Sequence, residues 1–444
     1  MKHTFSQRMW RALSAGLLMT LLLASSTPAA LAQDDQAPDD HAHGRAQRKI
    51  LAGYFEEWSI YAADYNVANL QSNDVANHLS HLLYAFGNVA PTTGAPNAQC
   101  QLADTWADYQ DPYLPSVNGQ PYPGPLYGNF AALQQLKQLH PNLKIMISLG
   151  GSSSTNAAGF SYAASTPALR SQLATSCIDL FLAGNIGPGI SAPDLFDGID
   201  IDWEFPAASD KENFTLLLQE FRHQLDALGQ VNHHHYLLTI FAPAGSQNYS
   251  DIELAKVATQ TDFFNLQGYD LNGTWETVTN DAASLLDSRH DPNYGQGLFV
   301  DAVVRAYLNA GVPASHLVLG VPLYGYGWTG VPDVKNGLYQ TSTGPAPSPA
   351  GDSLETAGLA TFLTLESLTG FKHHYDPIRI AQWIYDPATQ TFWTYDDPYI
   401  AWAKALYVDF RVPGGLGGAV VWAFKDDDTN GTMVKTLAFG LGRP

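Results

Sequence analysis

Three things are scarce in this sequence. Only two of its 444 residues are cysteines, Cys100 and Cys177, so a scaffold held by many disulfides is excluded. Basic residues are few, with 22 Lys and Arg against 42 Asp and Glu and a formal net charge of −20. Such a surface repels phosphate backbones and anionic lipid, so nucleic-acid and membrane-surface partners are not expected. Beyond the N-terminus, no apolar run is long enough to cross a bilayer.

The N-terminus has the pattern of an export signal. Lys2, Arg8 and Arg11 precede an apolar run over residues 13–24, and small residues then lead to Ala30-Leu31-Ala32. This predicts a signal peptide over residues 1–32; the alternative is an uncleaved anchor. Residues 33–48 are polar and aperiodic, which predicts a disordered leader. We therefore expect a soluble protein in the medium or the periplasm, where the two cysteines form either one disulfide or two buried thiols.

Eight short apolar runs indicate strands, at residues 51–55, 81–87, 143–151, 196–204, 236–243, 262–270, 317–325 and 417–424. Between them, segments such as 129–139, 211–228 and 297–311 repeat apolar residues every three or four positions, as amphipathic helices do. Buried strands alternating with helices predict an α/β protein with parallel strands, and eight units predict a closed TIM (β/α)8 barrel. No Gly-x-Gly-x-x-Gly follows the first strand, and no nucleotide or other cofactor is expected.

The interval between the seventh and eighth strands is too long for one crossover helix. It contains "TSTGPAPSPAGDSL" and then "RIAQWIYDPATQTFWTYDD", whose alternation predicts a hairpin. We expect a small α+β insertion over residues 326–396, followed by a helix at 399–410 that rejoins the barrel. The barrel then comprises residues 49–325 and 397–444.

The fourth predicted strand, "FDGIDIDWE", is unusually acidic. Successive strand residues face opposite sides, so Asp200, Asp202 and Glu204 share one face, which in a barrel is the interior, with Glu204 at the C-terminal mouth. Asp197 is out of phase and is expected to be structural. Mutual repulsion and burial leave at least one proton shared among the three carboxyls, and a carboxyl whose pKa is raised in this way can act as a general acid.

Glycoside hydrolysis suits such an acid in a chain that is 12% aromatic. Most glycosidases place a second carboxylate across the cleft, but all three acids here come from one strand. This favours the substrate-assisted exception, in which a group of the substrate itself attacks. A structural ion-pair network is the alternative, but Lys and Arg are scarce near the inward ends of the predicted strands.

The motifs resemble glycoside hydrolase family 18, which includes many chitinases. "DGIDIDWE" (197–204) matches its D-x-x-D-x-D-x-E signature, "SLGG" (148–151) resembles its S-x-G-G, and "YDLNGTW" (269–275) resembles its Tyr-Asp segment. "LVLGVPLYGYGW" and "GGAVVWAFKDD" look like strands seven and eight, and the insertion, which ends in "YDDP" (395–398), looks like the chitinase insertion domain. The resemblance covers about residues 49–444.

The resemblance implies catalytic roles for four residues. Glu204 would donate the proton to the glycosidic oxygen, and Asp202 would orient the N-acetyl group for attack on the anomeric carbon. Asp200 would share a proton with Asp202, and Tyr269 would donate a hydrogen bond to the acetamido oxygen. Asp270 would bind the sugar nearby.

The resemblance also implies sugar contacts. Trp422 would form the floor of the subsite before the cut, Tyr54 and Trp275 would line the cleft, and Tyr324 on strand seven is a further candidate. Three positions depart from the family pattern. Gln267, a further candidate for substrate binding, replaces a frequent Met, where it either adds a polar contact or fills the space. Ser152 stands where many members have Trp, and Tyr326 stands where many have Arg. The missing Trp wall would then have to come from elsewhere, with Trp106 as one source.

The sequence thus predicts a secreted, monomeric chitinase that cleaves β-1,4 bonds between N-acetylglucosamine units with retention. The alternatives are a non-catalytic chitin-binding lectin and an endo-β-N-acetylglucosaminidase acting on N-glycans or peptidoglycan. No Cys/His cluster has zinc-ligand spacing, so no metal is expected. The runs His233–His235 and Asp426–Asp428 are expected to be solvated loops.

Overall fold

The computed structural model describes residues 48–91 and 98–443 of the chain. Residues 1–47, which hold the predicted signal peptide and all but the last residue of the predicted leader, lie outside the described residues.

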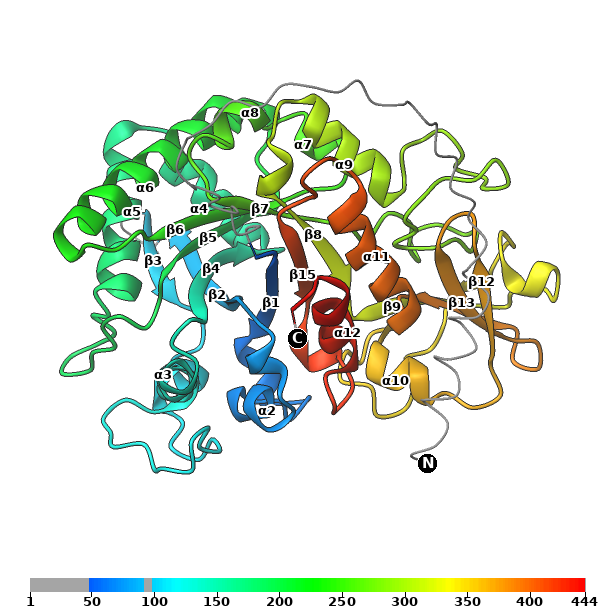
Figure 1. Cartoon of the computed structure of the whole chain (residues 1–444), viewed down its shortest axis with the longest axis horizontal. Coiled ribbons are helices and arrows are strands. Elements are labelled where there is room, and N and C mark those ends of the chain that lie inside the picture. Colours follow the sequence, from blue (N-terminus) through cyan, green and yellow to red (C-terminus); the bar gives the residue numbers. More distant parts are fainter. Residues whose placement is uncertain (1–47, 92–97, 444) are drawn as a thin grey trace, which may run out of the picture. The chain divides into compact units, whose positions relative to one another are not determined.

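A closed parallel barrel occupies most of the described chain (Figure 1). Its eight strands are β1 (Ile50–Glu56), β2 (His81–Pro91), β4 (Lys144–Gly151), β5 (Gly198–Trp203), β6 (Leu237–Ala242), β7 (Phe263–Leu266), β8 (Leu317–Pro322) and β15 (Gly418–Trp422). Each pairs in parallel with its neighbour, and β1 pairs with both β15 and β2, which closes the ring. The predicted TIM barrel is therefore confirmed.

Helices cover the outside of the barrel strands (Figure 1). They are α2 (Val67–Ser72), α3 (Gly128–Leu139), α4 (Ser154–Ala164), α5 (Pro167–Cys177), α6 (Lys211–Asn232), α7 (Ser246–Tyr249), α8 (Leu254–Val257), α9 (Val300–Asn309), α11 (Pro398–Phe410) and α12 (Thr432–Gly440). α11 begins as its sequence requires: the Asp397 side chain accepts a hydrogen bond from the Ile400 N–H (2.9 Å), and Pro398 occupies the first turn, where no N–H is needed.

The outward face of β5 shows how strand and helices share the main core. Ile199, Ile201 and Trp203 point away from the barrel axis and are buried. The Trp203 ring stacks on Phe160 of α4 (5.4 Å between centroids) and meets Phe214 of α6 edge-on (5.5 Å). Each such side chain contributes roughly 1.5–3 kcal/mol by leaving water. This packing holds β5 in place, so the inward face is free to carry polar groups.

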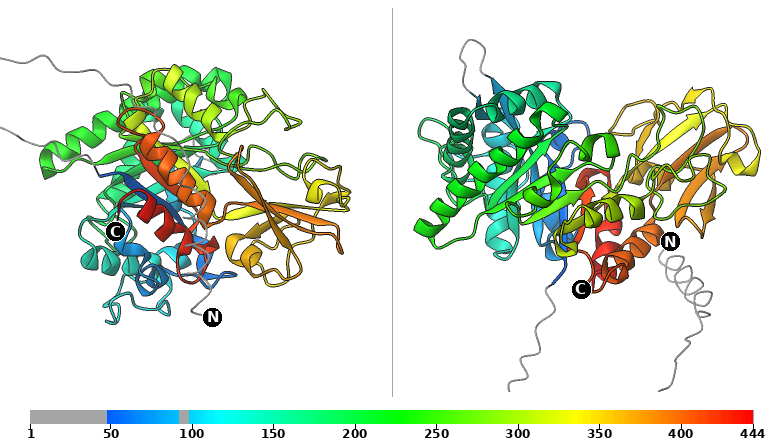
Figure 2. Two further views of the ribbon diagram at one scale, coloured as in Figure 1. Left: turned by 45° about the vertical axis from the view of Figure 1, so that its right-hand side comes forward. Right: turned by 90° about the horizontal axis from the view of Figure 1, so that it is seen from above.

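A second, antiparallel sheet lies beside the barrel, as Figure 2 shows from two directions. It is formed by β9 (Tyr324–Thr329), β10 (Gly344–Pro345), β11 (Leu359–Thr361), β12 (Lys372–Asp376), β13 (Ala381–Asp386) and β14 (Thr391–Tyr395), with helix α10 (Phe362–Ser367). β13 and β14 form the hairpin predicted from the alternation. The sheet begins at Tyr324, two residues before the predicted start of the insertion.

The long segment after β2 is fastened covalently. β2 continues beyond its barrel pairing and forms an antiparallel pair with β3 (Ala98–Leu102). Cys100 of β3 forms a disulfide with Cys177 at the end of α5, with 4.9 Å between their Cα atoms. Of the two alternatives that the sequence left open, the structure thus has the disulfide rather than two free thiols.

The other predicted elements differ from the structure mainly at their ends. The strand predicted over residues 262–270 stops at Leu266 in β7, because the chain leaves the barrel there and Asp270 adopts the left-handed conformation (φ 57°). Tyr269 and Asp270 therefore lie on a loop after the strand, not on it. Predicted helices at 129–139, 211–228, 297–311 and 399–410 correspond to α3, α6, α9 and α11.

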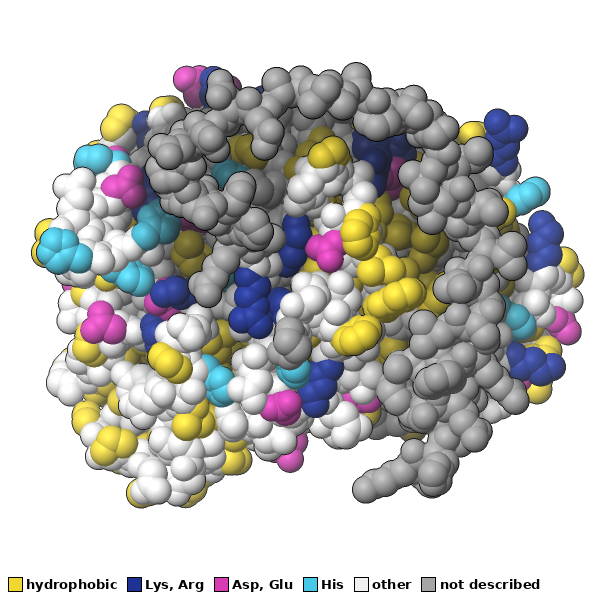
Figure 3. Space-filling model, in the orientation of Figure 1, with side chains coloured by type: hydrophobic (Ala, Val, Ile, Leu, Met, Phe, Trp, Pro, Cys, Tyr) yellow, Lys and Arg dark blue, Asp and Glu magenta, His cyan; other side chains and the backbone are white. Residues whose placement is uncertain are grey.

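The surface varies in character across one face of the molecule. Figure 3 shows hydrophobic side chains gathered over α11, with basic, acidic and histidine side chains interspersed elsewhere on the part of the face that the described residues form. Among the described residues, no helix has the length and apolar character to cross a membrane.

Candidate active site

The acidic strand places its carboxyls at the centre of the barrel mouth. Asp200 and Asp202 of β5 point inward and are 0% and 2% exposed, and Glu204 follows the last strand residue and is half-buried. The contacts of Asp200 with four surrounding strands show that its side chain faces the barrel interior.

Asp200 is fully satisfied by hydrogen-bond donors from four other strands. Its Oδ2 atom accepts from the hydroxyls of Tyr54 (3.1 Å) and Ser148 (2.7 Å). Its Oδ1 atom accepts from the Thr239 hydroxyl (2.6 Å) and the Asn265 amide (3.0 Å). Burial raises the pKa of Asp200, and all four hydrogen bonds oppose that increase because they stabilise the carboxylate.

Asp202 has a different environment two residues further on. Its Oδ1 atom is buried and has no hydrogen-bond partner among the described residues. Burial raises the pKa of Asp202 well above its usual value, and the charges of Glu204 and Asp200 raise it further. Of the two acids, Asp202 thus has the environment that more strongly favours the protonated form.

Glu204 has the protonation behaviour of a general acid. Burial and then the nearby charge of Asp270 raise its pKa to about 7. A carboxyl in that range is partly protonated at neutral pH and can both give and take a proton. It lies at the mouth, where a bound molecule can reach it.

Asp270 is surrounded by neutral donors. Its Oδ1 atom accepts hydrogen bonds from the hydroxyls of Tyr324 (2.5 Å) and Tyr326 (3.0 Å), and its Oδ2 atom accepts one from the Gln267 amide (3.5 Å). The Gln267 Oε1 atom in turn accepts from the Ala244 N–H (3.0 Å). Gln267 thus makes the polar contact that its departure from the family pattern left open. Burial raises the pKa of Asp270, and the three donors lower it.

Tyr269 joins this group from the same loop. It is 7% exposed, and a small pocket between the barrel end and the second sheet is lined by Tyr269, Asp270, Tyr324 and Tyr326 together with Thr394 and Tyr395. Burial and then the charge of Asp270 raise the pKa of Tyr269, so its hydroxyl stays protonated and can donate a hydrogen bond.

Aromatic rings line the other side of the mouth. The half-buried ring of Trp422, the last residue of β15, lies 5.0 Å from the Tyr54 ring and 5.8 Å from Phe86, between centroids. Phe86 in turn lies 5.9 Å from Trp58, which is 39% exposed. Flat rings at the edge of a polar centre suit the apolar faces of sugar rings.

Trp275 lies on the loop after β7. Its ring is 60% exposed and meets the Tyr326 ring edge-on at 5.3 Å between centroids. The predicted residues therefore form one assembly, in which Asp200, Asp202 and Glu204 are central, Tyr54 and Trp422 lie to one side, and Tyr269, Asp270, Tyr324 and Trp275 lie to the other. Trp106 is 44% exposed in a short helical turn (Trp106–Gln110).

The sequence reasoning missed Ser148, Thr239 and Asn265, which hold Asp200. Each is a polar residue within an otherwise apolar strand, and Ser148 and Thr239 lie in register with Asp200 on the neighbouring strands. That pattern was available from the sequence: once the strands are ordered as a barrel, polar residues at matching inward positions must meet.

The expectation that Asp426–Asp428 form a solvated loop is wrong for two of the three residues. Asp426 is buried and pairs with Lys425 (2.7 Å), which also pairs with Glu56 (3.1 Å). Asp427 is buried and accepts hydrogen bonds from two backbone N–H groups in the first turn of α12 (both 3.1 Å). Unpaired N–H groups at a helix start attract carboxylates, which explains part of the acidic run.

Asp197 has the structural role expected of it. Its carboxylate pairs with Lys137 (2.8 Å) and Lys144 (3.3 Å) and accepts a hydrogen bond from the Ile145 N–H (2.9 Å) at the closed end of the barrel. Within the described ranges, no group of three or more His, Cys, Asp or Glu side chains is arranged to hold a metal ion.

Comparison with known proteins agrees with this geometry. The model of the family "Glycosyl hydrolases family 18" matches residues 50–427. Chitinase A1 of Niallia circulans is 33% identical over 88% of this chain and 58% of its own length, and Endochitinase 1 of Metarhizium robertsii is 33% identical over 93% of this chain and 90% of its own.

A solved structure supports the same assignment. The catalytic domain of psychrophilic chitinase B from Arthrobacter TAD20 is 33% identical and superposes with a TM-score of 0.80, over 88% of this chain and 95% of that one. With a family model over most of the chain and a relative of this identity covered along 90% of its length, the chain belongs to glycosyl hydrolase family 18.

Proposed function

We propose that this chain is a secreted chitinase that hydrolyses β-1,4 bonds between N-acetylglucosamine units, with retention and with help from the substrate's own acetamido group. The family and the chitinase names of its relatives support the substrate class. The chain spans 58% of the first of these relatives and 90% of the second, so activity is assigned to the catalytic unit described here.

One observation carries the substrate-assisted part of the proposal. The buried Oδ1 atom of Asp202 has no hydrogen-bond partner in the described part of the chain, whereas Asp200 beside it accepts four hydrogen bonds. A buried polar atom without a partner is costly, so it is expected to find one when substrate binds. The N–H group of an acetamido substituent is a donor of the right kind, and a hydrogen bond to Asp202 would orient the acetamido carbonyl for attack.

The steps follow from the protonation states. Protonated Glu204 gives its proton to the glycosidic oxygen as the C1–O bond breaks, and the acetamido carbonyl oxygen forms a bond to C1. The resulting oxazolinium ion carries a positive charge. The single negative charge that Asp200 and Asp202 share stabilises it, and Tyr269 donates a hydrogen bond to the acetamido oxygen. Glu204, now ionised, takes a proton from water as that water attacks C1 and the bond from C1 to the acetamido oxygen breaks, which restores the original anomer.

The surrounding residues would bind consecutive sugars. Trp422 would support the sugar before the cut, with Tyr54 beside it. Asp270, positioned by Gln267 and Tyr324, would bind a sugar hydroxyl, and Trp275 would contact a sugar further along the chain. Residues 49–325 and 397–444 would form the barrel, and the insertion at 326–396 would form one wall of the cleft.

The proposal is tested on the hexamer of N-acetylglucosamine with the mature protein and its Glu204→Gln variant. We expect short products whose new ends are initially β-anomers, and a loss of turnover on the order of 10²–10⁴-fold in the variant. Initial release of α-anomers would contradict retention, and equal turnover of both proteins would remove Glu204 as the acid.

Two further outcomes point to the alternatives. Tight binding of the hexamer without cleavage by either protein would indicate a lectin. Poor cleavage of the hexamer with rapid cleavage of N-glycan cores or peptidoglycan would indicate an endo-β-N-acetylglucosaminidase. Export is tested separately, because the secreted protein should begin at Gln33 if residues 1–32 are a signal peptide.

A further inference from the structure

The segment between β7 and α9 presents two of the proposed sugar contacts without regular structure of its own. Residues 267–299 contain no helix and no strand beyond an isolated bridge at Val278, and they carry Asp270 and Trp275. A long loop inside a compact domain needs partners for its backbone and side chains, because buried polar groups must be hydrogen-bonded. The partners of this post-β7 loop (residues 267–299) therefore decide where Asp270 and Trp275 lie.

Arg379 of the insertion supplies several of these partners at once. It lies in the turn between β12 and β13, and its side chain is 1% exposed. One terminal nitrogen of its guanidinium is 2.9 Å from Asp291 Oδ2 and donates to the Ser284 hydroxyl (3.1 Å). The Arg379 carbonyl accepts hydrogen bonds from the N–H groups of Leu285 and Leu286 (both 3.0 Å). Arg379 thus touches the post-β7 loop through both its side chain and its backbone.

The charge of Arg379 is matched within the protein. Arg379 and Asp291 bury their side chains together, at 1% and 6% exposure. The second terminal nitrogen donates to the Tyr339 hydroxyl (3.0 Å), and the guanidinium lies over the Tyr339 ring at 5.7 Å from its centroid. Arginine suits such a site because its planar fork offers several donors in fixed directions. Removing it leaves a buried, unpaired carboxylate on the post-β7 loop.

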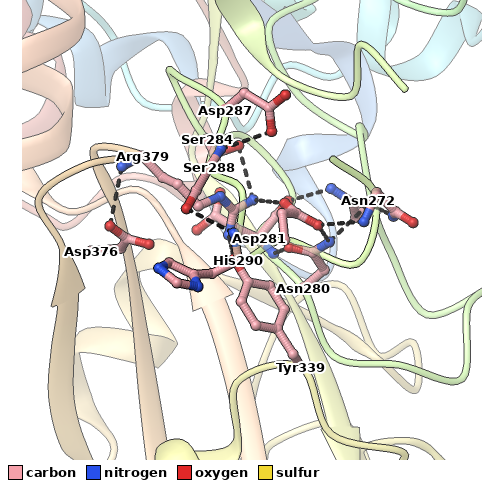
Figure 4. A network of polar contacts seen from close by, with 12 residues as sticks. Asn272, Asn280, Asp281, Ser284, Asp287, Ser288, His290, Tyr339, Asp376 and Arg379 are labelled. Atoms are coloured by element: carbon pink, nitrogen blue, oxygen red, sulfur yellow. Dashed lines mark hydrogen bonds and ion pairs between the residues drawn. The ribbon is translucent and has the colours of Figure 1, made fainter. Parts of the chain in front are cut away.

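A chain of side-chain contacts leads from Asp291 back to the catalytic end of the loop, and Figure 4 shows two of its members, Asn280 and Asn272. Asp291 Oδ1 accepts a hydrogen bond from the Asn280 amide (2.9 Å), and Asn280 also donates to Asn272 Oδ1 (3.4 Å). The Asn272 amide donates to the Asp281 carbonyl (2.8 Å). Asn272 lies two residues after Asp270 and three before Trp275, so this chain of contacts ends beside both sugar-binding candidates.

The second sheet holds the same loop at further points. The hydroxyls of Tyr324 and Tyr326 of β9 donate to Asp270 itself. The Trp328 ring N–H of β9 donates to the Glu276 carbonyl (2.9 Å), and the Thr394 hydroxyl of β14 donates to Asp281 Oδ2 (3.0 Å). Of these contacts from the second sheet, only the one from Arg379 pairs opposite charges. It is therefore the contact whose loss should loosen the loop most.

We propose that Arg379 is a positioning residue for substrate binding. By pairing with Asp291 it fixes the post-β7 loop, and through Asn280 and Asn272 it keeps Asp270 and Trp275 where Tyr324 and Tyr326 contact them. The insertion then does more than form a wall, because it holds the loop that binds the sugar chain. This inference rests on the proposed function only for the identity of the substrate. The residues that transfer protons, Asp200, Asp202 and Glu204, belong to β5 and are not held by this network.

The test compares Arg379→Met and Arg379→Lys with Arg289→Met. Arg289 belongs to the same loop and is exposed, so its substitution removes the same charge without touching the network. Hydrogen–deuterium exchange of residues 267–299 and steady-state kinetics on the hexamer of N-acetylglucosamine are both measured. The Lys variant keeps a positive charge opposite Asp291. It can therefore be used for the same measurements if Arg379→Met does not fold.

We expect exchange in the loop of Arg379→Met to rise about tenfold while exchange in β5 is unchanged. We expect kcat/KM for the hexamer to fall about tenfold, mainly through a higher KM, because Asp270 and Trp275 bind the sugar chain. A smaller fall in kcat is also expected, because Tyr269 belongs to the same loop. The Lys variant should fall between the Met variant and the wild type, and Arg289→Met should match the wild type.

Two results would overturn the proposal. One is unchanged loop exchange and unchanged KM in both Arg379 variants. The other is faster exchange throughout the barrel with a fall in kcat alone, which would make Arg379 a general stabiliser. If the wild type does not cleave the hexamer, the proposed function fails, but loop exchange still decides whether Arg379 positions the loop.

Discussion

Asp200 and Asp202 lie two residues apart on the inward face of β5, yet Asp200 accepts four hydrogen bonds and the Oδ1 atom of Asp202 accepts none from the described residues. Both are buried, so desolvation disfavours the charge on each. The donors around Asp200 stabilise its carboxylate, whereas the charges of Glu204 and Asp200 act against ionisation of Asp202. A proton shared by the pair therefore favours Asp202, and the negative charge favours Asp200.

Replacing Asp200 by Asn tests this arrangement. The variant removes a negative charge that raises the pKa of Asp202, so Asp202 should lose its proton at lower pH. With Asp200 neutral, no carboxylate remains to balance the oxazolinium ion when Asp202 is protonated. We expect kcat on the hexamer to fall by about 10²-fold and its pH profile to change shape.

The matched control is Ser148→Ala, which removes one donor to Asp200 but keeps its charge. Its loss of activity should be much smaller than that of Asp200→Asn. If Asp200→Asn leaves both turnover and the pH profile as in the wild type, the shared proton plays no part in the reaction.

Substitution of Asp270 should move the pH dependence in a defined direction. The charge of Asp270 raises the pKa of Glu204, which is about 7 in the wild type. Activity needs Glu204 protonated, so kcat/KM should decline as the pH rises through that value. In Asp270→Asn the pKa of Glu204 falls, and the decline begins at lower pH. The quantity to measure is kcat/KM at pH 8 relative to pH 6, which should be smaller in the variant than in the wild type.

Gln267→Met separates the charge of Asp270 from its hydrogen bonds. It removes the 3.5 Å contact to Asp270 Oδ2 but leaves the carboxylate in place. The ratio of its kcat/KM at pH 8 to its kcat/KM at pH 6 should stay close to that of the wild type, even where its KM differs. A ratio in Asp270→Asn equal to that of the wild type would show that Asp270 does not influence the acid.

Trp422→Ala should weaken use of the hexamer. The Trp422 ring lies against Tyr54 and Phe86 and leaves one face at the barrel mouth, so a sugar ring that packs there loses apolar contact in the variant. A loss of roughly 1.5–3 kcal/mol corresponds to a fall in kcat/KM of about 10–100-fold. Trp422→Phe keeps a flat ring and should lose much less. Unchanged kinetics in the Ala variant would place the sugar elsewhere.

Much of the barrel could be predicted because apolar residues follow different spacings along the sequence in buried parallel strands and in amphipathic helices. The runs that became β1, β4 and β8 are mostly apolar, and α6 repeats its apolar residues at helical spacing. The end of β7 was harder, because "NLQGYD" continues the alternation of a strand past the point where the backbone turns away. Only the positive φ of Asp270 shows that turn.

The site residues that lie on one strand could be predicted from the sequence. Those that meet across several strands could not. Asp200, Asp202 and Glu204 are visible from their spacing in a single segment. The donors to Asp200 come from strands far apart in the sequence, such as Ser148 and Thr239, and their meeting depends on the order and register of the barrel. The contacts of Arg379 with Asp291 depend on how the insertion packs on a loop without regular structure, for which the sequence has no periodic signal.

A second pair of buried acids lies apart from the three acids of β5. Glu57 follows β1 directly, Asp108 lies in the helical turn after β3, and they are 6% and 1% exposed. The Tyr84 hydroxyl donates to Asp108 Oδ1 (2.6 Å), and the carboxyls of Glu57 and Asp108 lie close enough to hydrogen-bond to each other when one of them is protonated. Burial raises the pKa of both carboxyls, and the Asp108 charge raises that of Glu57 further. The folded protein therefore holds a proton here that the unfolded chain has lost.

Stability should consequently fall as the pH rises above the range where unfolded carboxyls ionise. In the unfolded chain Glu57 and Asp108 ionise near pH 4, whereas in the folded protein their pKa values are raised. Their contribution to the free energy of unfolding is therefore complete below about pH 4 and is lost as the pH increases towards the folded pKa values. In Glu57→Gln the side chain at position 57 is neutral at every pH, so the part of the pH dependence of stability that Glu57 causes is removed. Between pH 5 and 7 the free energy of unfolding, measured with urea, should decline less steeply in the variant, by up to about 1.4 kcal/mol per pH unit for one proton.

The exposed Glu212 of α6 provides the control, since the free energy of unfolding of Glu212→Gln should decline with pH as that of the wild type does. Parallel curves for the wild type and Glu57→Gln would mean that the pair is ionised in the folded protein.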